Sequence, residues 1–259
     1  LALTGADAVR SHLIYAMSTK VPVLVVTATG REAEDLTAEV KSMIGDRVAM
    51  FPSWETLPHE KLSPAVDTVA QRRKALYDVR RGKVDVLIAA VRSLVQPIVD
   101  DLEAETSAPI HVQLDQDCED LVERLVHHGY SHVDMVGRRG QFAVRGGIVD
   151  VFPATEELPV RIELWGDEVT DLRAFSVADQ RTISEVEVDQ LDIFPCRALL
   201  IDDDVKAAAE KLATTRSGQV QEMLTRIGDG QWVEGMESLI PLISQHPMKM
   251  LTEVMPEKT

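Results

Sequence analysis

Cysteine is scarce in this chain. Its 259 residues include only Cys118 and Cys196, and neither belongs to a Cys-x-x-Cys motif. Two isolated cysteines cannot form the multi-disulfide framework of a small secreted domain, and they lack the spacing of a zinc site. We therefore expect two reduced thiols in a cytoplasmic protein.

Long hydrophobic runs are missing as well. No stretch approaches the roughly 18 consecutive apolar residues of a membrane-spanning helix, and the first residues lack a charged segment followed by an apolar one. Hydrophobic residues still make up 45% of the chain, an ordinary fraction for a folded protein. We expect about two domains and no contact with a membrane.

Positive charge and aromatic side chains are both in short supply. The 27 Lys and Arg residues are outnumbered by 43 Asp and Glu residues, which gives a formal net charge of −16. DNA would meet a repulsive average field unless basic residues cluster on one face. Tyr15, Tyr77 and Tyr130 are far apart in the sequence, so the aromatic residues do not indicate a stacking platform for single-stranded DNA.

Two local clusters could suggest other chemistry. Residues 72–83, "RRKALYDVRRGK", are the one basic run, and we interpret its arginines as a solvated helix face rather than a DNA site. His127, His128, His132 and Asp134 could resemble metal ligands. Adjacent side chains on a helix point about 100° apart, so we expect no metal there.

The first third of the chain alternates between helical and strand patterns. Amphipathic periodicity predicts helices over 6–18, 31–45 and 67–82. Apolar, β-branched runs predict strands over 21–29, 48–52 and 84–91. Repeated β–α units of this kind imply a parallel sheet with helices on its faces.

The pattern changes near residue 107. After a predicted helix over 116–129, closely spaced strands are predicted over 132–137, 141–145, 147–152, 159–165, 168–175 and 185–193. This spacing is typical of an antiparallel meander in an α+β domain. We therefore divide the chain into an α/β part (1–106), a β-rich domain (107–193) and a helical return to the first part with a tail (194–259).

The segment "LTGADAVRSHL" (3–13) stands where an α/β domain could carry a phosphate-binding loop. A working loop, G-x-x-x-x-G-K-[ST], needs backbone N–H groups, a lysine and a hydroxyl to hold phosphates and Mg²⁺. This chain keeps Gly5 but has Asp7 in place of the second glycine, and Ala8 and Val9 in place of the Lys and Ser/Thr. We predict a degenerate loop that does not hydrolyse ATP.

Residues 142–153, "FAVRGGIVDVFP", place an arginine beside two glycines. A phosphate-binding loop is not favoured, because Gly146 and Gly147 lie between predicted strands rather than before a helix. The glycines are expected to permit a bulge or a bend. Strand alternation directs Arg145 away from the face of Phe142.

The stretch "PVRIELWG" has two different faces because side chains alternate along a strand. One face suits a core: Val160, Ile162 and Leu164. The other mixes residues that are typical of an interface hot spot: Arg161, Glu163 and Trp165. If the strands are neighbours, Arg145 joins this second face in one exposed patch. The alternative is an Arg stacked on the Trp, with Glu163 in a surface ion pair.

Several long motifs, taken in order, carry a family resemblance. After the degenerate loop come "FPSWETLPHEKLSP" (51–64), "RRGQFAVRGGIVDVFP" (138–153) and "LPVRIELWGDEVTDLRAFSVADQRT" (158–182). They closely resemble the N-terminal, UvrB-like region of the bacterial transcription-repair coupling factors, the Mfd family, through about residue 200. The "WETLP" run and the missing loop lysine favour Mfd over UvrB. In place of the tyrosine-rich DNA-clamping hairpin of UvrB, residues 53–68 hold one aromatic, Trp54.

The resemblance implies a fold and a site. The fold would be a helicase-like α/β domain of degenerate P-loop type with an inserted antiparallel α+β domain. In this family the β-rich domain recruits UvrA, and matching the motifs places the contact on Arg145, Arg161 and Trp165, with Glu163 beside them. Phe is expected at position 165 in some relatives.

The resemblance also implies what lies elsewhere. The fragment would be catalytically inactive and need no cofactor, because ATP and Mg²⁺ would belong to a downstream translocase motor. RNA polymerase and DNA would be partners of downstream domains, and another domain would mask the UvrA-binding face. The alternative function is a DNA-clamping ATPase fragment of UvrB type.

Overall fold

The computed structural model describes residues 9–57, 60–101 and 104–255. The chain forms two compact units, one of residues 1–55, 71–102 and 247–259, the other of residues 56–70 and 103–246. This division differs from the predicted one. The helical segment 194–246 belongs to the β-rich unit instead of returning to the first part, and only the chain from residue 247 returns.

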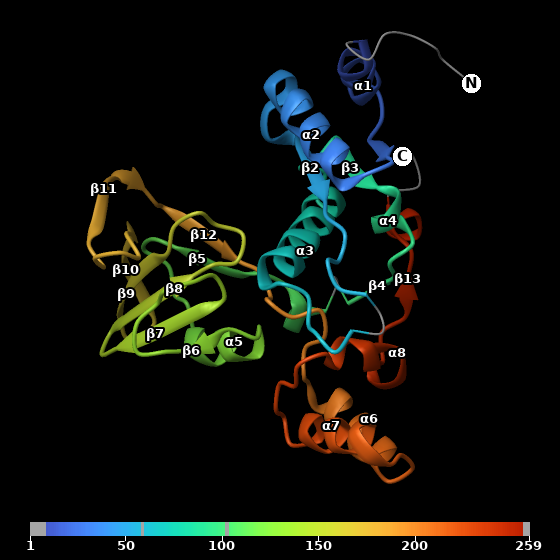
Figure 1. The fold of residues 1–259 in the computed structure, drawn as a ribbon. Coiled ribbons are helices and arrows are strands. Elements are labelled where there is room, and N and C mark those ends of the chain that lie inside the picture. Colours follow the sequence, from blue (N-terminus) through green and yellow to red (C-terminus); the bar gives the residue numbers. More distant parts are fainter. Residues whose placement is uncertain (1–8, 58–59, 102–103, 256–259) are drawn as a thin grey trace. The chain divides into compact units, whose positions relative to one another are not determined.

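The first unit is an α/β unit. In chain order its elements are α1 (Arg10–Ser18), β1 (Val23–Thr27), α2 (Gly30–Ile44), the 3-10 turn η2 (Gly45–Arg47), β2 (Val48–Phe51), most of α3 (Val66–Arg80), β3 (Val86–Ala90), α4 (Val91–Leu94), β4 (Ile98–Val99), β13 (Met248–Lys249) and α9 (Leu251–Val254). Parallel pairing gives the sheet order β1-β3-β2 (Figure 1). The predicted parallel sheet is confirmed.

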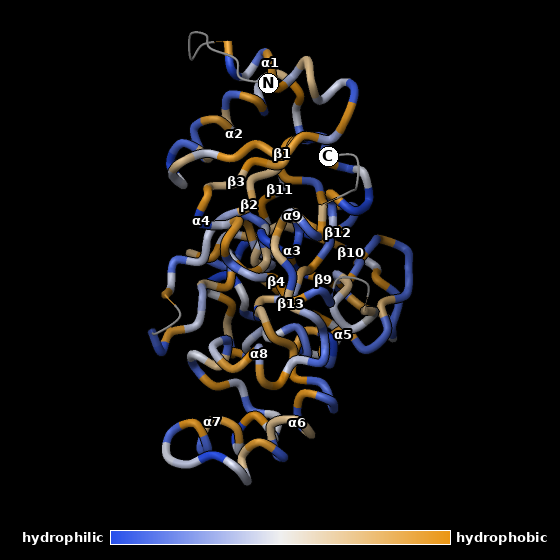
Figure 2. The backbone as a smooth tube through the Cα atoms, turned by 90° about the vertical axis from the view of Figure 1, so that its right-hand side faces the viewer, coloured by the Kyte–Doolittle hydropathy of each residue, from blue (hydrophilic) through white to orange (hydrophobic). Residues whose placement is uncertain are grey.

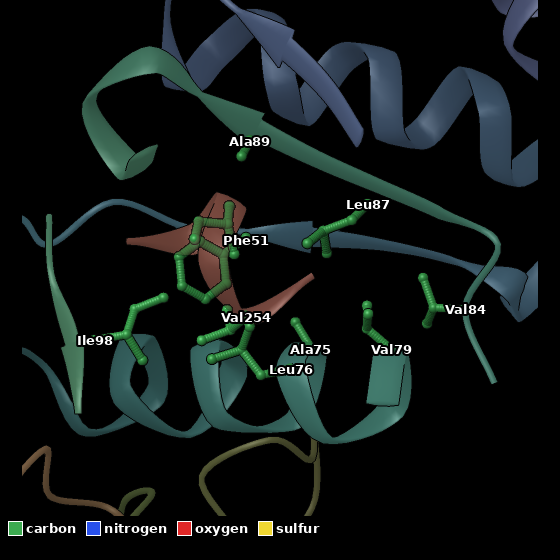
Figure 3. Packing of buried hydrophobic residues seen from close by; sticks show 10 residues of the cluster. Phe51, Ala75, Leu76, Val79, Val84, Leu87, Ala89, Ile98 and Val254 are labelled. Carbon is green, nitrogen blue, oxygen red and sulfur yellow. The ribbon is translucent and has the colours of Figure 1, made fainter. Parts of the chain in front are cut away.

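Helices cover both faces of this sheet. β3 is the middle strand and is buried at all five positions, and hydrophobic residues run along it and β1 (Figure 2). On one face Leu76 and Val79 of α3 pack against Phe51 and Leu87 (Figure 3). The other face packs against α2. Each strand is apolar on both sides because each face is covered.

The first two arginines of the basic run do not lie on the solvated face that its composition suggested. Arg72 and Arg73 are both buried within the first unit. The Arg72 guanidinium lies 4.1 Å from the ring centroid of Phe51 and 4.2 Å from that of Trp54, and burial lowers its pKa to about 9. Arg73 donates to both carboxylate oxygens of Asp101, at 3.2 and 2.9 Å. These two side chains are therefore not available to DNA.

The second unit contains a six-stranded sheet and a helical segment. Its elements after the start of α3 are η3 (Glu105–Ser107), β5 (Ile110–Gln113), α5 (Leu121–His127), β6 (Ser131–His132), β7 (Gln141–Arg145), β8 (Ile148–Phe152), β9 (Val160–Trp165), β10 (Glu168–Phe175), β11 (Thr182–Glu187), β12 (Gln190–Ile193), α6 (Asp203–Ala213), α7 (Gly218–Gly228), η4 (Met236–Leu239) and α8 (Ile240–Ile243). The sheet order is β11-β10-β9-β8-β7-β6 (Figure 1).

The predicted antiparallel meander is confirmed from β7 to β11. Two details differ. The strand predicted over 132–137 is reduced to β6, which runs parallel to β7. The strand predicted over 185–193 is split, and its second half, β12, pairs with β5 in a separate two-stranded sheet. In the described residues, no helix has both the length and the apolar character to cross a membrane.

Candidate functional site

A tight hairpin connects β7 and β8. Arg145 pairs with Ile148, so Gly146 and Gly147 form a two-residue turn. Gly146 has φ +63°, which glycine adopts without the strain that a side chain brings. A Cβ on Gly147 would lie 2.7 Å from the carbonyl oxygen of Leu164. The glycines thus form a hairpin turn rather than a bulge, and the missing side chain of Gly147 lets the turn approach the backbone of β9.

Strand register places the predicted residues on one face. Asp150 of β8 lies opposite Arg161 of β9, and Ile148 lies opposite Glu163. Arg145 of β7 also lies opposite Ile148. Residues directly opposite each other on neighbouring strands point to the same face of the sheet, so Arg145, Arg161 and Glu163 lie on one face. The two arginines come from strands that are separated by one strand, and Asp150 is part of the strand between them.

Asp150 lies beneath the two arginines and is only 1% exposed. Arg161 donates to it through Nε at 2.7 Å and through Nη2 at 2.9 Å, a two-bond geometry that fixes the plane of a guanidinium. Arg145 Nη2 lies 3.9 Å from the same carboxylate. The hydrogen bond that Arg161 donates to Asp150 raises the pKa of Arg161. One buried carboxylate therefore orients one arginine and attracts the other.

Sequence reasoning missed Asp150. The sequence does mark this residue: it is the single acidic residue within the apolar strand "IVDVF", and the next strand contains an arginine. A buried acid needs such a partner because an unpaired buried charge is strongly unfavourable.

Arg161 does not stack on Trp165, as the alternative explanation required. Its guanidinium carbon lies 5.0 Å from the ring centroid of Phe175. Glu163 does take part in a surface ion pair, with its Oε1 3.7 Å from Nη1 of Arg173. Exposed pairs of this kind contribute under about 1 kcal/mol.

Trp165 is 82% exposed at the end of β9. It pairs with Glu168 across a two-residue turn in which Gly166 has φ +65°. The Arg145 side chain is half exposed, and its Nη2 donates to the carbonyl oxygen of Asp134 at 3.2 Å. We call the face made by Arg145, Arg161, Glu163 and Trp165 the Arg–Trp surface.

The remaining candidate residues belong to the degenerate loop and to the histidine cluster. Gly5, Asp7 and Ala8 of the degenerate loop lie outside the described residues, and Val9 directly precedes α1. The rings of His127 and His128 are 6.2 Å apart and tilted by 47°. Across residues 9–57, 60–101 and 104–255, no group of three or more His, Cys, Asp or Glu residues could hold a metal ion.

Comparison with known proteins identifies the family. Residues 109–199 match the family model described as "UvrB interaction domain". The transcription-repair-coupling factor of Mycobacterium tuberculosis (strain CDC 1551 / Oshkosh) is 45% identical over 273 residues, which cover 100% of this chain and 22% of that protein. The chain belongs to the transcription-repair-coupling factor family. The matched domain contains the whole Arg–Trp surface of this coupling-factor chain.

More distant coupling factors match most of the chain. The protein of Bacillus subtilis (strain 168) is 32% identical over 215 residues, covering 80% of this chain and 18% of the relative. The protein of Escherichia coli (strain K12) is 28% identical over 264 residues, covering 99% and 23% respectively. The chain thus spans less than a quarter of the coupling factors that it matches.

Proposed function

We propose that this chain is the UvrA-recruiting module of a bacterial transcription-repair coupling factor and that the Arg–Trp surface binds UvrA. The proposal depends on one observation. An exposed tryptophan and two arginines that share a buried carboxylate lie together on the domain that matches the UvrB interaction family. Trp and Arg are the residues most enriched in the energetic centres of protein interfaces.

The surface is suited to binding because it is ordered before a partner arrives. Asp150 holds Arg161 through two hydrogen bonds, and Trp165 is held at the end of a paired strand. Side chains that are already ordered lose less conformational entropy on binding. The Trp165 ring also leaves most of its apolar area for a partner to bury.

The remaining functions of the family would depend on other parts of the longer protein. In a cytoplasmic coupling factor, this module would bring UvrA to a stalled RNA polymerase, while the ATP- and Mg²⁺-dependent motor and the contacts with DNA and polymerase lie elsewhere. Another domain would mask the Arg–Trp surface until recruitment is needed. The first unit would be a helicase-like fold whose degenerate phosphate loop is inactive.

Arg145→Ala is expected to weaken binding to purified UvrA about tenfold, the effect of losing one exposed charged contact in a hot spot. The fold should persist, because Asp150 keeps its two hydrogen bonds from Arg161. Isothermal titration calorimetry measures the affinity. Arg216→Ala, at an exposed arginine elsewhere in the second unit, is the matched control. Equal affinities for Arg145→Ala and the wild type would exclude Arg145 from the interface.

The chain is expected neither to bind nor to hydrolyse ATP, because Asp7, Ala8 and Val9 replace the residues that hold phosphate and Mg²⁺. ATP titration should give no binding heat, and a phosphate-release assay should equal the buffer blank. An active P-loop ATPase is the positive control. Phosphate release by this chain would instead favour the DNA-clamping ATPase of UvrB type.

A further inference from the structure

Three connections meet at one end of the six-stranded sheet. The β7–β8 turn follows Arg145, and the β9–β10 turn follows Trp165. Because β6 runs parallel to β7, the chain leaves β6 at this same end through residues 133–136. Met135 lies in this segment. The end of the sheet that presents Arg145 and Trp165 therefore also includes Met135.

The backbone around Met135 is fixed on both sides. Val133 N donates to the carbonyl oxygen of Phe142 at 2.9 Å, and Arg145 donates to the carbonyl oxygen of Asp134. Val136 is fully buried and its carbonyl oxygen accepts from Gln180 Nε2 at 3.1 Å. The two neighbours of Met135 are thus anchored, so binding a partner there would not require ordering the backbone.

Met135 is nevertheless 61% exposed. Methionine is enriched in interfaces, where its flexible and polarisable thioether adapts to the shape of a partner. The neighbouring residue Asp134 accepts a hydrogen bond from Arg145, which places Met135 next to the predicted contact. An exposed apolar side chain on a fixed backbone beside a charged anchor matches the environment of Trp165.

We propose that Met135 is a second apolar anchor for UvrA, on the opposite side of Arg145 from Trp165. This inference rests on the proposed function of the Arg–Trp surface. Met135 follows β6 and Trp165 ends β9, and strands β7 and β8 lie between β6 and β9 in the sheet. The matching surface of UvrA would have two apolar depressions, with an acidic group between them that meets Arg145.

The first test measures the affinity of UvrA for variants at Met135. Met135→Ser should weaken binding about tenfold, because the partner's depression loses an apolar occupant. Met135→Leu keeps the apolar volume and should bind within about threefold of the wild type. Met17→Ser, at another exposed methionine, is the matched control and should bind like the wild type. Circular dichroism verifies that each variant is folded.

The second test detects burial of position 135 directly. Cys118 and Cys196 are both buried, and burial raises the pKa of each thiol, that of Cys196 to about 12. Both thiols should react slowly, since the thiolate is the reactive form. Met135→Cys therefore introduces one fast-reacting site. UvrA should slow alkylation at that site about tenfold or more and leave the rate of Met17→Cys unchanged.

The outcomes separate the inference from the proposed function. If Arg145→Ala loses affinity while Met135→Ser binds like the wild type and UvrA does not protect Met135→Cys, Met135 is outside the interface and the UvrA-binding function stands. If wild-type chain does not bind UvrA, both proposals fall. Loss of affinity in Met135→Ser, retention in Met135→Leu and protection of Met135→Cys together support the second anchor.

Discussion

Arg161→Ala is expected to lower the free energy of unfolding of the β-rich unit by about 3 kcal/mol. The substitution removes both short hydrogen bonds to Asp150 and leaves a carboxylate that is almost completely buried. Arg145, at 3.9 Å, offers only a longer contact. Urea unfolding followed by circular dichroism gives the free energy of unfolding for each variant.

A paired substitution controls for the loss of side-chain volume. Asp150→Leu combined with Arg161→Met replaces both charges by apolar groups and should be clearly more stable than Arg161→Ala alone, because no buried charge is left without a partner. If Arg161→Ala costs less than about 1 kcal/mol, Asp150 does not depend on this arginine. In binding experiments, Arg161→Ala would weaken binding through loss of folding as well as through loss of a contact.

Strand alternation predicted which side chains share a face of the β-rich sheet, but it could not predict which residues lie opposite each other on adjacent strands. The separation of Val160 and Ile162 from Arg161 and Glu163 follows from the two-residue period alone. The pairing of Asp150 with Arg161 depends on the register between β8 and β9. These strands are joined by residues 153–159 rather than by a two-residue turn, so tertiary packing sets that register. The sequence therefore indicated the Arg–Trp surface without indicating the carboxylate beneath it.

Long-range pairing explains the other differences. Arg72 and Arg73 were expected in solvent because a helix with several charges usually has a solvated face. In the structure Arg73 donates to Asp101, 28 positions away in sequence, and the Arg72 guanidinium lies over two aromatic rings. Similarly, the helical pattern after residue 194 predicted helices correctly, but periodicity contains no information about which unit those helices join.

Trp165→Ser is expected to weaken UvrA binding about a hundredfold, the largest effect on affinity that we predict for a single side chain. A tryptophan that is buried only on binding contributes through its whole apolar area, and serine removes nearly all of it. The free energy of unfolding should change little, because the ring is largely outside the packed unit. Surface plasmon resonance should show the loss mainly as faster dissociation.

Two further variants determine whether the effect belongs to the aromatic ring at this position. Trp165→Phe should recover most of the affinity, since phenylalanine can enter the same depression with a smaller area. Val220→Ser, at an exposed apolar residue on α7, should bind like the wild type, which would exclude a general effect of surface polarity. If Trp165→Ser retains wild-type affinity while Arg145→Ala loses it, binding depends on the charges and the exposed ring has another role. If both variants retain full affinity, UvrA binds outside the Arg–Trp surface.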